Sequence, residues 1–141
     1  MKANRTLILN ALLIFILFVS CSSPSDSTND SPTSEQIKII GKPIRIGNIE
    51  VAQYDFPKTM SWYDADESCK GLGDGWRLPT KDELNFMYEN KNEIGGFRSG
   101  DYYWSSSMSD GDHGWIQLFR DGYQDELSLR FKEFVRAIRT F

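Results

Sequence analysis

Residues 61–84, SWYDADESCKGLGDGWRLPTKDEL, predict two capped helices joined by a glycine turn. Ser61 can cap the first helix, and Asp64 three residues later completes a weak capping box. Gly73 suits the end of that helix, and Gly75 gives the turn. Apolar residues recur between them at helical spacing, which puts them on one face. They are Trp62, Ala65, Cys69 and Leu72.

The end of this stretch predicts a second helix with a stronger start signal. Thr80 and Glu83 form a Thr-x-x-Glu capping box directly after Pro79, in which each side chain can satisfy a free backbone N–H. The helix should cover residues 81–90. Its expected buried stripe is Leu84, Met87 and Tyr88.

The chain before this stretch alternates apolar and polar residues from Gln36 onward. A period of two is typical of half-buried strands, and Pro43 interrupts it. Gly47-Asn48 lies between two alternating segments and predicts a two-residue hairpin turn. The apolar positions are Ile37, Ile39, Ile44, Ile46, Ile49 and Val51.

The chain after residue 101 changes to strands and turns. Residues 102–106 and 115–119 predict strands, with a polar loop at 109–114 between them and a turn at 120–123. In the last run Leu129, Phe131, Val135, Ala137 and Phe141 alternate with Arg130, Lys132 and Arg136. Arg139 breaks the apolar parity, so we expect a carboxylate partner or an edge position for it. These patterns predict an α+β fold, with two helices packed on antiparallel sheet.

The first 20 residues have the order of a secretory signal. Lys2 and Arg5 precede residues 7–19, an apolar run with only Asn10 inside it, whereas a spanning helix needs about 20 residues. The run ends in Leu17-Phe18-Val19-Ser20-Cys21, which resembles a bacterial lipobox. We therefore expect several acyl chains on Cys21 to anchor the mature chain in the membrane. An ordinary cleaved signal and an uncleaved anchor are the alternatives.

Residues 21–35 are expected to form a tether. Residues 22–34 are serine, threonine, proline, asparagine and aspartate without one apolar residue, so they cannot bury a core. The folded domain should then occupy residues 36–141. This organisation predicts a protein of the bacterial cell envelope, lipid-anchored in the outer membrane or at the cell surface.

Charge and cysteine content exclude several classes of function. Without residues 1–20 the chain has 14 basic and 20 acidic residues, a net charge of −6, whereas nucleic-acid binders carry a basic face. If Cys21 carries lipid, Cys69 is the one remaining thiol, which leaves no internal disulfide and no cysteine zinc site. Because Cys69 lies on the apolar helix face, we expect a buried side chain rather than a reactive thiol.

Three blocks resemble a bacterial domain family. They are Gly75-Trp76-Arg77-Leu78-Pro79-Thr80 with Glu83-Leu84, then Tyr103-Trp104-Ser105-Ser106, then Val135-Arg136-Ala137-Ile138-Arg139. The family is the domain of unknown function named after the C-terminal domain of a collagen-like adhesin, and the likeness covers residues 46–141. It implies a C-type-lectin-like fold with structural roles for Trp76, Arg77, Leu78, Pro79 and Glu83. The adhesin relative is associated with sulfated glycans, which implies carbohydrate binding and adhesion.

In the wider superfamily, residues 62–73 resemble the first-helix pattern of C-type lectins, and residues 77–80 resemble a segment of formylglycine-generating enzymes. Several features of those relatives are missing from this sequence. Cys69 has no cysteine partner near the C-terminus, and the Glu-Pro-Asn, Gln-Pro-Asp and Trp-Asn-Asp triplets that supply calcium ligands do not occur. The reactive cysteine pair of the formylglycine enzymes is absent as well. The resemblance therefore carries over the fold but not a calcium-dependent sugar site or that enzymatic activity.

Aromatic and basic residues make up the candidate ligand-binding set. Tyr103, Trp104 and Trp115 belong to an aromatic group that either fills the core or offers ring faces to sugars. Neighbouring strand residues point to opposite sides, so Tyr103 and Trp104 cannot both be core if the sheet is open on one side. Arg130 and Arg136, with Lys132 between them, form either a basic stripe for sulfate groups or a solvated face with salt bridges.

The only histidine lies in an acidic glycine loop. Asp110, Asp112 and His113 are candidate metal ligands, because alternating acids in such a loop suit calcium. The loop lacks a distant bidentate acid, and a solvated loop is the alternative. His113 has no recognisable serine or cysteine nucleophile beside it, so we expect no catalytic role.

These observations lead to one functional hypothesis and two alternatives. We expect a non-catalytic binding domain, without a required cofactor, that recognises a glycan or protein ligand outside the cytoplasm. Its other partner is the membrane, reached through lipid on Cys21; nucleic acid is not expected. The alternatives are an accessory subunit of a surface protein assembly and a formylglycine-generating-type enzyme.

Overall fold

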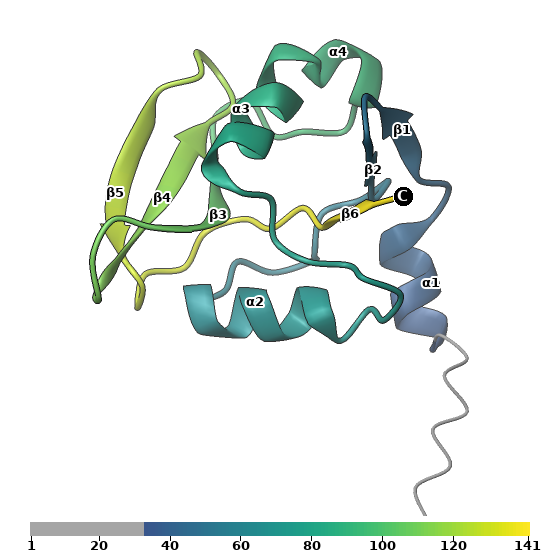
Figure 1. The fold of residues 1–141 in the computed structure, drawn as a ribbon, viewed down its shortest axis with the longest axis horizontal. Coiled ribbons are helices and arrows are strands. Elements are labelled where there is room, and N and C mark those ends of the chain that lie inside the picture. The colour runs from purple at the N-terminus through teal and green to yellow at the C-terminus, as the bar shows by residue number, and fades with distance from the viewer. Residues whose placement is uncertain (1–32) are drawn as a thin grey trace, which may run out of the picture.

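The computed structural model describes residues 33–141 (Figure 1). The expected signal sequence, the acylated Cys21 and most of the expected tether lie outside these residues. None of the helices within residues 33–141 has the length and hydropathy needed to cross a bilayer.

The described chain begins with a short helix, α1 (Ser34–Ile40), where strand was expected. Thr33 and Gln36 form a reciprocal capping box at its start, a local signal that the alternation of isoleucines concealed. Residues two positions apart in a helix point in different directions, so Ile37 and Ile39 do not share a face. Ile39 packs against the core, whereas Ile37 is 56% exposed. The helix also takes in Ser34 and Glu35, which were assigned to the tether.

Strands β1 (Ile44–Ile46) and β2 (Ile49–Val51) pair antiparallel across the Gly47-Asn48 turn, as predicted. Strand β6 (Ile138–Thr140) completes this sheet in the order β1-β2-β6. The prediction for Arg139 is confirmed on both counts. It lies in the edge strand β6, and its Nε donates to Glu50 Oε2 at 2.6 Å.

The stretch that predicts two helices folds as expected. Helix α2 (Trp62–Lys70) is capped by Ser61, whose hydroxyl accepts from the Asp64 N–H. It ends at Gly71, slightly earlier than predicted, and Gly73 and Gly75 adopt positive φ in the turn that follows. Helix α3 (Lys81–Glu89) has the predicted Thr80–Glu83 capping box, and a four-residue helix α4 (Lys91–Ile94) follows it.

A second antiparallel sheet contains β3 (Tyr102–Met108), β4 (His113–Leu118) and β5 (Gln124–Ser128) in that order. Two of these strands were predicted. Strand β5 was not, because its acidic sequence, QDELS, lacks the alternating apolar residues that mark a half-buried strand. Helix α2 lies on one side of the domain and helices α3 and α4 lie on the other (Figure 1).

Both faces of the strand β3 are covered. Trp104 packs in a cluster with Ala65, Cys69 and Leu72 of the α2 region. Tyr103 packs in a second cluster, with Leu84 and Met87 of α3 among others. Tyr103 and Trp104 are both fully buried, because the sheet is not open on either side at this point. Cys69 is fully buried too, as expected.

Most of the alternating run from Leu129 to Phe141 does not form a strand; only its end, Ile138–Thr140, does so, as β6. Between Leu129 and Ala137 it makes only isolated bridges, Met60 with Glu133 and Tyr103 with Phe134, and Phe131 is 60% exposed. Arg136 is 1% exposed, so Arg130, Lys132 and Arg136 form neither a shared basic stripe nor a shared solvated face.

The buried Arg136 guanidinium is fully engaged. Its Nε donates to Asp55 Oδ1 at 2.6 Å, and its Nη2 donates to the Gly96 carbonyl at 2.9 Å. Nη1 lies within hydrogen-bond distance of the carbonyls of Ala52, Gln53 and Gly95. This one side chain therefore joins three segments that are distant in the sequence.

Replacing Arg136 with methionine should destabilise the domain by about 3–5 kcal/mol, because Asp55 would stay buried without its partner. The free energy of unfolding, measured by urea titration, tests this. Arg130→Met is the matched control: Arg130 is exposed and six positions earlier in the same run, so its effect should stay within about 0.5 kcal/mol. Equal effects of the two substitutions would contradict this assignment.

Candidate ligand-binding surfaces

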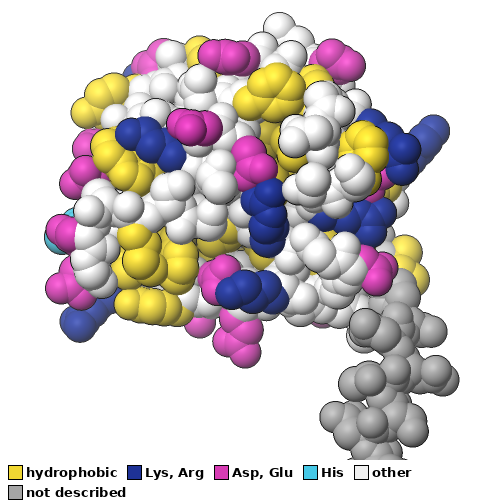
Figure 2. All heavy atoms as spheres, viewed as in Figure 1, with side chains coloured by type: hydrophobic (Ala, Val, Ile, Leu, Met, Phe, Trp, Pro, Cys, Tyr) yellow, Lys and Arg dark blue, Asp and Glu magenta, His cyan; other side chains and the backbone are white. Residues whose placement is uncertain are grey.

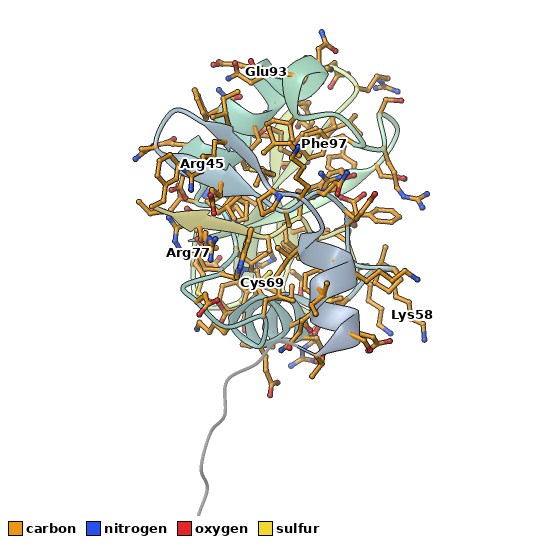
Figure 3. All side chains as sticks on the ribbon, turned by 90° about the vertical axis from the view of Figure 1, so that its right-hand side faces the viewer. Arg45, Lys58, Cys69, Arg77, Glu93 and Phe97 are labelled. Atoms are coloured by element: carbon orange, nitrogen blue, oxygen red, sulfur yellow. The ribbon has the colours of Figure 1, made fainter. Side chains whose placement is uncertain are left out.

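The block from Trp76 to Glu83 makes contacts inside the fold. Arg77 forms a bidentate pair with Glu83, at 2.7 and 2.8 Å, and exchanges backbone hydrogen bonds with Ile138 of β6. The Arg77 guanidinium holds the pKa of Glu83 below its ordinary value. The block thus fixes the start of α3 against the edge of the first sheet, with Arg77 near β6 in Figure 3. Trp76, Leu78 and Pro79 of the block are buried.

The first two candidate aromatic residues have no surface to offer a ligand. The Tyr103 hydroxyl donates to Asp55 Oδ2 at 2.8 Å and accepts from the Arg98 N–H at 2.9 Å. Trp104 donates its indole N–H to the Met60 carbonyl at 3.0 Å. Their polar atoms are satisfied within the domain, so both residues stabilise the fold instead of facing solvent.

Trp115 and Arg130 are the candidate ligand-binding residues that keep some exposure. Trp115 is half-buried, and the Lys81 ammonium lies 2.9 Å from the centre of its ring. A cation over an indole face is attracted by the ring quadrupole, so this face is already occupied. Arg130 is exposed, but Arg136, six positions later in the same segment, is buried. The structure therefore does not bring the candidate residues together in one site.

The loop at Asp110 is organised by its own backbone. One Asp110 carboxylate oxygen accepts from the N–H groups of Asp112 and His113, each at 2.8 Å, and lies 3.0 Å from His113 Nδ1. These bonds, the one from the Asp112 N–H above all, hold the pKa of Asp110 below its ordinary value. Among residues 33–141, no group of three or more His, Cys, Asp and Glu side chains is placed to hold a metal ion.

An aromatic pair at the start of α2, the half-buried Trp62 and the exposed Tyr63, was not in the candidate set. The rings of Trp62 and Tyr63 meet edge to face, with centroids 5.6 Å apart. Trp62 is anchored by its indole N–H, which donates to the Ser105 carbonyl at 2.8 Å. Tyr63 is 56% exposed, and hydrophobic side chains gather over this end of α2 in Figure 2. The sequence did contain a signal for this pair: Trp62 and Tyr63 are adjacent, and only Trp62 fits the buried face of the helix, which leaves Tyr63 to face solvent.

A groove lies beside α1. This groove has a volume of about 780 Å³ and runs between α1, the connector after β2 and the last turn of α2. Apolar side chains, among them Ile39, Phe56 and Met60, line its floor, and two exposed lysines, Lys38 and Lys58, also line it. Sequence reasoning missed this site because α1 was expected to be a strand.

Comparisons with known proteins agree on the fold and identify a family. Botrocetin superposes with a TM-score of 0.53 at 15% identity, covering 72% of this chain and 98% of that chain. EMS16, described as an antagonist of the collagen receptor integrin α2β1, gives 0.53 at 10% identity, covering 70% and 97%. Botrocetin in complex with the von Willebrand factor A1 domain gives 0.51 at 13% identity, covering 72% and 98%.

These solved structures are C-type-lectin-like domains, so they confirm the predicted α+β C-type-lectin-like fold. At such low identities the likeness shows the fold alone. A search of curated protein sequences finds no match. The likeness to the collagen-like-adhesin family stays a prediction.

The family is shown by sequence. The profile of FGE-sulfatase, the sulfatase-modifying factor enzyme 1-like domain, matches residues 28–141. In the sequence, only residues 77–80 pointed in this direction, as a segment similar to formylglycine-generating enzymes. Because the match spans most of the sequence, the chain belongs to the family of sulfatase-modifying factor enzyme 1-like domains.

Proposed function

We propose that this chain is a cell-envelope lipoprotein whose domain is a non-catalytic binding module for a surface protein. The observation that carries the proposal is the Trp62–Tyr63 pair, in which the half-buried Trp62 supports the exposed Tyr63, at the start of α2 and at the end of the domain opposite α1 (Figure 1). Aromatic side chains of this kind dominate the energetics of protein interfaces. Botrocetin, on the same fold, has been solved in complex with a protein domain.

The chemistry of Cys69 supports a non-catalytic domain. The formylglycine-generating relatives use a pair of reactive cysteines, whereas Cys69 is the one cysteine within residues 33–141. Its side chain is fully buried, and burial raises the pKa of the thiol well above its ordinary value. A thiol that stays protonated and out of contact with solvent is a poor nucleophile.

A glycan is the second candidate ligand. Exposed aromatic faces suit sugar rings, and Tyr63 offers one. Against this, Tyr103, Trp104 and Arg136 of the expected glycan set are buried. The burial of these three candidate residues is our reason for preferring a protein ligand over a sulfated glycan.

The Cys69 assignment predicts slow alkylation of the folded protein. In the chain with Cys21→Ser, iodoacetamide should modify Cys69 at least a hundredfold more slowly in buffer than in denaturing urea, because the thiolate is the reactive form. Mass spectrometry of the intact chain measures both rates. Equal rates would mean an accessible thiol and would reopen the enzymatic alternative.

Lipid attachment is tested in cells. A chain expressed in a bacterial host that acylates lipoproteins should incorporate labelled fatty acid and fractionate with the envelope. Cys21→Ser should abolish the label, because the acyl chains have no other acceptor in a lipobox. Label that persists in this variant would contradict the lipoprotein assignment.

The binding surface is tested by Tyr63→Ala, with Tyr123→Ala as a control. Both tyrosines are 56% exposed, but Tyr123 follows the turn between β4 and β5, away from α2. A surface protein captured by the domain, once identified and purified, should bind the Tyr63→Ala variant at least tenfold more weakly and the control unchanged. A glycan array run with the same variants tests the second candidate ligand.

The array and the purified partner give three separable results. Loss of protein binding in Tyr63→Ala alone supports the proposal. Loss of glycan binding in that variant, without any protein partner, moves the assignment to a glycan. Equal binding by both variants would overturn the role of the Trp62–Tyr63 pair.

A further inference from the structure

Three lysines share pocket linings with Tyr54 on the α1 side of the domain. Lys38 and Lys58 line the groove of about 780 Å³ together with Tyr54, and Lys42 shares a neighbouring pocket with the same tyrosine. All three lysines are exposed, and Tyr54 is 53% exposed. In Figure 3, which views the α1 side, Lys58 projects away from the body of the domain.

This cluster is positively charged on an acidic chain. None of its lysines forms an ion pair with any residue in the part of the chain that the structure describes. Two carboxylates also line the groove, but Asp55 is neutralised by Arg136, which leaves Glu35 as the one opposing charge there. The local balance is therefore cationic, although the whole chain carries a net charge of −4.

The cluster lies near Thr33, the residue at which the described chain begins and the one nearest in sequence to the expected anchor at Cys21. Thr33 lines the same groove, and eleven residues, 22–32, separate it from Cys21. Whatever its conformation, a segment of that length spans at most about 40 Å, at 3.3–3.6 Å per residue. With Cys21 anchored as proposed, the groove cannot lie more than about 40 Å from the anchoring residue.

We propose that this face docks on the anionic phospholipid surface to which Cys21 anchors the chain, an inference that rests on the proposed lipid attachment. Tyr54 enters the interface between headgroups and acyl chains, where tyrosine is enriched in membrane proteins. Lys38, Lys42 and Lys58 face the phosphates, and each contributes about a fivefold gain in attachment. Docking this face turns the start of α2, at the opposite end of the domain, away from the membrane (Figure 1).

The test attaches the chain chemically, so that it does not depend on acylation in a cell. Residues 21–141, with Cys21 coupled to maleimide-bearing lipid, are placed on vesicles of phosphatidylcholine alone or with an equal part of phosphatidylglycerol. Cys69 does not compete for the maleimide, because it is fully buried. Amide hydrogen exchange is then followed by mass spectrometry.

The expected result is slower exchange in α1 and in residues 53–60 on the phosphatidylglycerol vesicles only. The protection should disappear in high salt, which screens exposed charges. Replacing Lys38 and Lys58 with glutamate should lower it at least tenfold. Arg120→Glu is the control: Arg120 is exposed in the turn before β5, away from α1, and its replacement should change nothing.

Other outcomes overturn the inference. Equal exchange on both vesicle types would show that the face does not dock on anionic lipid. Protection that depends on protein concentration, with or without vesicles, would assign the groove to a second copy of the chain. Failure of acylation in cells would leave this measurement intact, so the two proposals fail separately.

Discussion

The contact between Arg136 and Asp55 is the constraint around which the domain is arranged. A guanidinium with 1% exposure has lost its water shell, and the structure replaces that shell with one carboxylate and four backbone carbonyls. Those groups belong to the segment after β2 and to the glycine pair after α4. Asp55 also accepts from the Tyr103 hydroxyl, so the strand β3 joins the same network. Such a network is stabilising only when each polar group finds its partner, which fixes all three segments at once.

Two apolar clusters make up the core, and Tyr103 of this network belongs to one of them. With one cysteine within residues 33–141, the described domain has no internal disulfide and depends on packing. The fully buried Trp104 and Tyr103, on adjacent positions of β3, supply large side chains to the two clusters. This arrangement explains why residues that looked like ligand contacts became core. Strand β3 therefore contributes aromatic side chains to the core on both of its faces.

The two proposed binding surfaces lie at different ends of the domain. At one end lie the groove, Tyr54 and the lysines beside the point where the N-terminal segment enters. At the other end lies the Trp62–Tyr63 pair. Membership of the family of sulfatase-modifying factor enzyme 1-like domains does not by itself establish an enzymatic reaction, because activity depends on particular residues. Cys69, the one cysteine within residues 33–141, is buried.

The sequence by itself determined the elements whose signals are local. Caps, glycine turns and short periodic segments predicted α2, α3, the β1–β2 hairpin and two strands of the second sheet, because each depends on neighbouring residues. Tertiary structure decided the rest. Only the fold shows that Arg136 meets Asp55, 81 positions away, and that β3 is covered on both faces. Alternation in a sequence reports which residues share a side, but not which side faces water; that depends on what packs against it.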